Sequence, residues 1–380
     1  MPEKNRLTKN VLYCYIAIAI AFIVIRLLST FGVFSGFGTV GTYILNASVQ
    51  IGLLFVISLF LFSYLNKSKV KETFKFYGFK KMSIKVVFIA ILIGVIVYVL
   101  NVYLSAFFYK ILEMLGYRSS SNIGGGSYPV WLLFVNLLVT AILPAICEET
   151  AHRGMLLKGF MPLGQKKAII ISSILFGLLH LNIEQFFYAT IIGFLLGYIT
   201  TACENIYPAM IIHFMNNGLS VFMGFSRARN LGVDKIFSWV NLSFANNPIL
   251  GALIFVLFAI TMLLLLRYLI VILFKNTAYQ KIGQMQDVLF KEVIRQAYLK
   301  DLDDIKNGVF EDKVQTISYE DFDKIYKNKG VDLGHFSEID SKVLLDNQKY
   351  KMDKTTKILL ISLFVLLGAL TLFTFIWGVL

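Results

Sequence analysis

Long apolar runs, separated by short polar connectors, fill most of the chain. A helix needs roughly 20 apolar residues to cross the hydrocarbon core of a bilayer, and most of these runs are about that long. The predicted spans are Val11–Leu28, Tyr43–Leu65, Ile84–Phe108, Val130–Ile146, Ala168–His180, Phe186–Ala202, Ala209–Phe225, Ile249–Phe274 and Ile358–Val379. The fifth run is short and is expected to continue past Leu181. The pattern predicts an all-α polytopic membrane protein, with a bundle of about eight helices, a cytosolic soluble insert and a C-terminal anchor helix.

The same pattern divides the chain into five regions. We expect N-terminal transmembrane helices in 1–128, a core rich in membrane-embedded polar residues in 129–225, a further transmembrane helix in 226–274, a soluble cytoplasmic module in 275–357 and the last transmembrane helix in 358–380. The soluble module contains His335 without a companion His or Cys, which favours a structural or solvated histidine over a metal ligand. The N-terminus has a basic flank and no small-residue cleavage site, so its first span is expected to stay uncleaved.

The net charge of +13 is spread over short basic segments that flank the apolar runs. This distribution follows the positive-inside rule and argues against a nucleic-acid partner, so the expected location is the lipid bilayer of the cell membrane. The rule places the N-terminus and the connector 67–81 in the cytoplasm, whereas Arg227, Arg229 and Lys235 count against it. The aromatic and basic segment Lys69–Lys81 is predicted either as an interfacial helix or as a solvated loop.

Ionisable residues stand at the end of the fourth span. Glu148, Glu149 and Arg153 follow the apolar run directly, although a charge inside a bilayer costs several kcal/mol. Glu149 and Arg153 are i,i+4 neighbours on a helix and can pair. Glu148 points about 100° away around the helix and is left without a local cation. The sequence therefore predicts a separate task for Glu148.

Two further spans carry polar side chains. The fifth run ends at His180, and the seventh contains His213 and Asn217, which share one helix face because they are i,i+4. Asn216 points elsewhere and is the weaker candidate. These groups either hydrogen-bond between helices or form a hydrolytic site, in which one pair takes a proton from water and the other donates hydrogen bonds to an oxyanion. Their occurrence together on three spans favours the hydrolytic site.

At these residues the chain resembles the CPBP family, which comprises the type II CAAX prenyl proteases and the bacteriocin-processing (Abi) proteins. Three motifs carry the resemblance: Glu-Glu-x-x-x-Arg at 148–153, Phe-x-x-x-His at 176–180 and His-x-x-x-Asn at 213–217. Each motif is weak alone, and the ordered set is specific. The resemblance covers about residues 130–225. One departure is His152, where the family usually has an aromatic residue.

The resemblance implies an intramembrane endopeptidase of the glutamic type. Glu148 and His180 would activate water, His213 and Asn217 would form the oxyanion hole, and Glu149 with Arg153 would be a supporting ion pair. Zn²⁺ held by Glu148, His180 and His213 is the alternative, although the chain has no His-Glu-x-x-His motif, and we favour the metal-free site without a cofactor. Arg153 could instead bind a substrate carboxylate.

The implied substrate is a membrane-associated peptide or protein. Members of the family in bacteria are linked to bacteriocin immunity, peptide maturation and envelope control, and none of these roles follows from this sequence. The competing hypothesis is a non-catalytic scaffold or a transporter with a polar helix bundle. A transporter of that kind is expected to show internal repeats, and the chain has no convincing one.

Overall fold

The computed structural model describes residues 2–118, 129–237, 247, 249–277 and 352–379. These residues belong to one compact unit, Met1–Ala278 with Tyr350–Leu380. Most of the predicted soluble module 275–357, including His335, lies outside the described residues. All regular elements in the described part of the chain are helices, which confirms the all-α polytopic class.

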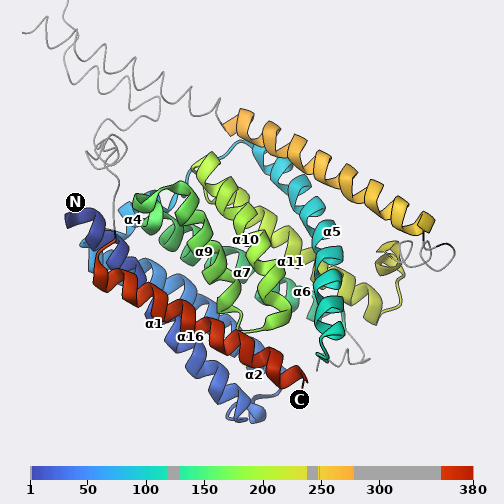
Figure 1. Cartoon of the computed structure of the whole chain (residues 1–380), viewed down its shortest axis with the longest axis horizontal. Coiled ribbons are helices and arrows are strands. Elements are labelled where there is room, and N and C mark those ends of the chain that lie inside the picture. Colours follow the sequence, from blue (N-terminus) through green and yellow to red (C-terminus); the bar gives the residue numbers. More distant parts are fainter. Residues whose placement is uncertain (1, 119–128, 238–246, 248, 278–351, 380) are drawn as a thin grey trace, which may run out of the picture. The chain divides into compact units, whose positions relative to one another are not determined.

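Figure 1 shows the arrangement of the helices. They are α1 (Pro2–Thr30), η1 (Ser35–Phe37), α2 (Gly38–Val49), η2 (Gln50–Leu61), α3 (Phe62–Asn66), α4 (Val70–Tyr77), α5 (Ile84–Met114), α6 (Val130–Asn136), η3 (Leu137–Ile142), α7 (Leu143–Glu149), η4 (Thr150–Leu157), α8 (Lys158–Phe160), η5 (Met161–Leu163), α9 (Gln165–Leu179), α10 (Ile183–Cys203), α11 (Tyr207–Ala228), η6 (Val233–Phe237) and α16 (Lys354–Val379). A further helix spans Ile249–Thr277.

Seven helices among the described residues are long and apolar enough to cross a membrane. They are Asn5–Thr30, Ser35–Asn66, Ile84–Met114, Val130–Leu163, Ile183–Cys203, Ile249–Thr277 and Lys354–Val379. Nine spans were expected, and the two that drop out are α9 and α11. Helix α9 has 15 residues, too few to cross the hydrocarbon core by itself. Helix α11 has 22 residues, but its His and two Asn lower its hydropathy. Both carry predicted site residues.

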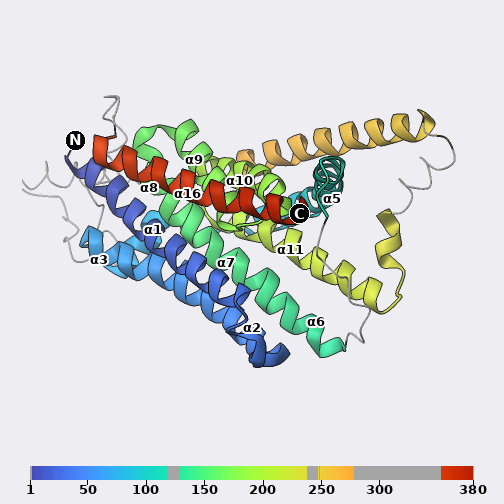
Figure 2. The ribbon, with the colours of Figure 1, turned by 60° about the horizontal axis from the view of Figure 1, so that its bottom comes forward.

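The helices pack around two apolar cores. One core joins α1, η2, η4, α9 and α16, and the other joins α5, α10, α11 and the helix Ile249–Thr277. Helices α9 and α10 form an antiparallel pair, and α11 lies against α5. Figures 1 and 2 show α1 and α16 side by side, with α10 and α11 between them and α5. The segment that carries the Glu pair is thereby surrounded by other helices.

One end of the unit gathers the lysine-rich connectors. The Thr8 hydroxyl at the start of α1 donates to the carbonyl of Gly159 (3.1 Å), and the Asn10 amide donates to Asn66 Oδ1 (3.1 Å). The Asn205 amide donates to the carbonyl of Lys80 (3.0 Å). Segments 66–81, 158–167 and 204–206 therefore lie at the same end, which we call the lysine-rich end.

The segment Lys69–Lys81 is helical over α4 and packs on the bundle. Tyr77 is fully buried and donates to the carbonyl of Ser58, and Thr73 is buried against Ser63, their hydroxyls 2.7 Å apart. The solvated-loop alternative is therefore wrong for residues 70–77. These residues form a helix, and its aromatic side chains pack against η2 and α3.

The helix Val130–Leu163 changes between α- and π-helical hydrogen bonding along its length. It is π-helical over η3 and η4, and the Glu pair lies at the end of α7, directly before η4. Side chains bond to carbonyls at this junction: Thr150 Oγ1 donates to Ile146 O (2.7 Å) and His152 Nδ1 to Glu148 O (2.8 Å). Short π-helical insertions in α-helices are frequent at functional sites.

Candidate active site

The predicted catalytic side chains line one cavity of about 440 Å³. Glu148 comes from α7, His180 from the residue after α9, and His213 and Asn217 from α11. Three segments far apart in the sequence are thus brought to one place. Glu149 and Arg153 do not line this cavity among the described residues, because their side chains are fully buried on another face of the helix.

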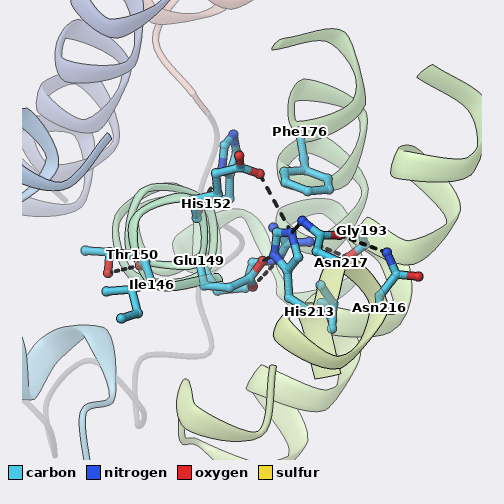
Figure 3. Close-up of polar contacts among 12 residues, drawn as sticks. Ile146, Glu149, Thr150, His152, Phe176, Gly193, His213, Asn216 and Asn217 are labelled. Atoms are coloured by element: carbon cyan, nitrogen blue, oxygen red, sulfur yellow. Dashed lines mark hydrogen bonds and ion pairs between the residues drawn. The ribbon is translucent and has the colours of Figure 1, made fainter. Parts of the chain in front are cut away.

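Glu149 connects two other members of the site (Figure 3). Its Oε2 lies 3.2 Å from Arg153 Nε, and its Oε1 lies 2.8 Å from His213 Nδ1. The first contact is an ion pair whose atoms are not aligned for a hydrogen bond. The second is a hydrogen bond between helices that the sequence analysis missed, since spacing along one helix reveals no partner on another.

Arg153 is held in place by three different groups. Besides Glu149, it donates from Nη2 to the carbonyl of Gly193 (3.3 Å), and its guanidinium lies 4.4 Å from the centre of the Phe176 ring. Arg153 has no exposed surface. The alternative in which Arg153 binds a substrate carboxylate is therefore not supported by this arrangement.

The protons of His213 follow from its contacts. Nδ1 faces the Glu149 carboxylate, which accepts, so Nδ1 carries a hydrogen. Nε2 lies 3.2 Å from the amide nitrogen of Asn217 and 4.0 Å from Glu148 Oε2. To donate a hydrogen bond to an oxyanion, the ring must also be protonated at Nε2. In this arrangement Nε2 is instead placed to accept from the Asn217 amide.

Asn217 is positioned by a chain of amides. Its Nδ2 also contacts the carbonyl of Thr140 (3.2 Å), and its Oδ1 accepts from Asn216 Nδ2 (3.0 Å). Asn216 accepts in turn from Asn101 Nδ2 on α5 (3.1 Å). Asn216 was expected to point away from the site, but it lines the cavity and orients Asn217.

Glu148 has a partner that the sequence analysis did not identify. Its Oε1 accepts a hydrogen bond from Gln50 Nε2 (3.2 Å), on the first residue of η2. The Glu148 side chain is 15% exposed, whereas that of Glu149 has no exposed surface. Glu148 is thus the carboxylate that a ligand in the cavity can reach. The signal for Gln50 was an amide in an otherwise apolar span, which is costly without a partner.

Phe176 is the common neighbour of three histidines. The rings of His152, His180 and His213 meet it edge-on, at centroid distances of 4.9, 5.2 and 5.9 Å. Arg153 stacks over the same ring. Phe176 therefore packs against four polar side chains and helps to fix their positions.

His180 stands where the chain reverses between α9 and α10. Its Nδ1 donates to the carbonyl of Phe176 (2.9 Å), which leaves Nε2 as the acceptor of a neutral ring. Leu181, the next residue, has a left-handed backbone (φ 47°), which is uncommon for a bulky side chain. Asn182 then caps α10 by accepting from the Glu184 amide (2.8 Å). This tight reversal places His180 at the cavity wall.

His152 lies beneath Glu148 and contacts α1. Its Nε2 is 3.1 Å from the oxygen of the Tyr15 hydroxyl, and that hydroxyl donates its hydrogen to the carbonyl of Leu175 (2.9 Å). Both side chains are buried. Together with the bond from His152 to Glu148 O, this contact ties the end of α7 to α1 and α9. The sequence analysis left His152 unexplained and did not identify Tyr15.

The zinc alternative requires several donor side chains arranged around one ion. No group of three or more His, Cys, Asp or Glu side chains in the described part of the chain is placed to hold a metal ion. The donor positions of the described residues therefore give no support to the zinc alternative.

Comparison with known proteins supports the resemblance. Residues 129–219 match the family described as Type II CAAX prenyl endopeptidase Rce1-like. This range contains all three motifs and every predicted site residue. Comparisons with curated proteins and with solved structures gave no match.

Proposed function

Residues 129–219 form an Rce1-like segment in a chain of membrane-spanning helices, and we propose that this chain is an intramembrane endopeptidase with Glu148 as its general base. The observation that carries the proposal is the cavity: Glu148, His180, His213 and Asn217 come from three segments and line the same space. The proposed substrate is a membrane-associated peptide or protein that enters this cavity, and no metal ion takes part.

The reaction begins with a water molecule between Glu148 and His180. The water oxygen attacks the carbonyl carbon of the peptide bond while its proton passes to the Glu148 carboxylate. Gln50 holds the other carboxylate oxygen, which leaves Oε2 free for the proton. The carbonyl oxygen becomes an oxyanion, the C–N bond breaks, and Glu148 returns the proton to the leaving amine.

The oxyanion is stabilised by His213 and Asn217. The Asn217 amide nitrogen and His213 Nε2 lie 3.2 Å apart, so both can turn towards one oxygen atom once Nε2 carries a proton. In the free protein the Asn217 amide contacts Thr140 O and His213 Nε2, and an oxyanion replaces these partners only when it forms. Glu149 accepts from Nδ1 of this ring and so orients it, and Arg153 pairs with Glu149.

The test is cleavage of membrane peptides by the purified full-length protein in detergent micelles. Glu148→Gln keeps the hydrogen bonding of the side chain but removes the base, and is expected to lower kcat by about 10²- to 10⁴-fold. The matched control is Glu184→Gln, a carboxylate near the cavity that does not line it among the described residues, with an expected rate close to wild type.

Cleavage in the presence of a strong chelator distinguishes the glutamate mechanism from a zinc-dependent one. Cleavage that depends on Glu148 and survives chelation supports the glutamate mechanism. Cleavage lost on chelation and restored by Zn²⁺ would make the same residues metal ligands and contradict the metal-free site. Cleavage that does not depend on Glu148 would overturn the protease assignment at this site and leave the scaffold hypothesis.

A further inference from the structure

The cavity extends well beyond the proposed catalytic residues. It is also lined by Arg26 and Ser29 of α1, Asn46 of α2, and Gln185 of α10. The proposed reaction uses none of these side chains. They make part of the cavity wall polar, which we call the polar region. Such a wall is suited to contact a polar group of a ligand.

This polar region lies far from the lysine-rich end. At 1.5 Å per residue, Arg26 is roughly 27 Å along α1 from Thr8, which contacts Gly159 at that end. Gln185 is likewise roughly 27 Å along α10 from Cys203. Glu148 is about 16 Å from Gly159 along its own helix. The cavity therefore runs from the catalytic residues towards the end opposite the lysine-rich one.

Arg26 is an unusual residue at its position. It belongs to the span Asn5–Thr30, which contains an 18-residue stretch of mean hydropathy 2.5, and a charged side chain is costly in such a span. Its side chain is exposed and lines the cavity. No carboxylate in the described part of the chain pairs with it, and it is the one Lys or Arg among the described residues that line the cavity. A guanidinium without a carboxylate partner at the wall of this cavity is suited to bind an anion.

We propose that Arg26 binds a carboxylate of the peptide substrate and so selects which peptides are cleaved. The inference rests on the proposed function, because it takes the ligand of the cavity to be a peptide. A peptide carries carboxylates at its C-terminus and on Asp and Glu side chains, and a guanidinium binds both as a two-pronged donor. The bound carboxylate lies on the side of Glu148 away from the lysine-rich end.

The experiment measures binding, so that it does not depend on cleavage. The full-length Glu148→Gln protein in micelles is titrated with apolar heptapeptides, randomised in sequence and labelled at the N-terminus with an uncharged BODIPY dye, and anisotropy is recorded. Three pools are used: one with a free C-terminal carboxylate, one with a C-terminal amide, and one with a C-terminal amide and an internal Asp. The second pool lacks any carboxylate, and the third distinguishes an acidic side chain from the chain end.

At least one carboxylate-bearing pool is expected to bind about tenfold more tightly than the uncharged pool. Adding Arg26→Gln should bring that ratio close to one without changing the affinity for the uncharged pool, and Arg26→Lys should restore part of it. The matched control is Arg267→Gln, an exposed arginine of the span Ile249–Thr277 that does not line the cavity, which should leave the ratio unchanged.

Equal ratios in the Arg26→Gln and Arg267→Gln proteins, or no saturable binding of either carboxylate pool, would overturn the proposal. The proposed function fails separately. If Arg26 controls carboxylate binding but the wild-type protein hydrolyses none of the bound peptides, the cavity is a peptide-binding site without the proposed chemistry.

Discussion

At the scale of single residues, the buried ion pair between Glu149 and Arg153 lies outside the cavity lining and holds a residue of the site in place. Both side chains have no exposed surface, and Glu149 also holds the His213 ring. Removing one partner of a buried pair leaves an uncompensated charge, which typically costs 3–5 kcal/mol, whereas replacing both is far less costly. The pair therefore links the stability of the protein to the position of a proposed catalytic histidine.

A double-mutant cycle tests this coupling. Glu149→Gln and Arg153→Met are each expected to destabilise the protein by about 3 kcal/mol, and the double variant by at least about 2 kcal/mol less than their sum. Unfolding of the full-length protein in mixed micelles gives the free energies. The two variants that carry Glu149→Gln should lose most of the activity, because His213 loses its carboxylate partner. Additive destabilisation would show that the two side chains do not interact.

At the scale of helices, the close approach of α9 and α10 depends on glycine. A Cβ atom added to Gly177 would lie 2.8 Å from the carbonyl oxygen of Phe186 and would also meet Thr190. Gly193 on α10 is similarly crowded, 3.2 Å from Ser173. Small residues at these positions let the two backbones pack together, as small residues commonly do between membrane helices. This packing places Phe176 and His180 against the rest of the site.

Alanine substitutions distinguish close packing from helix propensity. Gly177→Ala should destabilise the protein by about 1–3 kcal/mol, because backbone atoms must move. Gly218→Ala on α11 is the matched control: its nearest new contact is an ordinary 3.6 Å, so the gain in helix propensity makes it neutral or stabilising. Melting temperatures of the full-length protein in detergent provide the comparison. A Gly177→Ala protein as stable as Gly218→Ala would contradict this account.

The sequence predicted side-chain contacts within one helix better than contacts between helices. The i,i+4 relation of Glu149 to Arg153 and seven of the nine apolar spans followed from spacing, and the structure confirms these. Gln50 beside Glu148 and Tyr15 beside His152 could not be predicted, because a single sequence contains no information about which spans pack together. The contact of Glu149 with His213 was missed for the same reason.

At the scale of the whole unit, the lysine-rich connectors lie at one end, and the cavity extends towards the other. The connectors 66–81, 158–167 and 204–206 meet at the lysine-rich end, although they are far apart in sequence. Basic connectors of membrane proteins stay preferentially on the cytoplasmic side. Their meeting at one end strengthens the orientation that the sequence predicts, with the N-terminus of α1 in the cytoplasm.

Cysteine labelling tests this orientation. Single cysteines replace Lys71, Lys166 or Ser35 in a chain whose native Cys14, Cys147 and Cys203 are changed to serine. All three positions are exposed, and Ser35 lies between α1 and α2, away from the lysine-rich end. In intact cells a membrane-impermeant maleimide should label the cysteine at 35 alone, and all three after permeabilisation. Labelling of 71 and 166 but not 35 in intact cells would reverse the orientation. With the predicted orientation, Arg26 faces the side of the membrane away from the cytoplasm, and a substrate carboxylate would reach it from there.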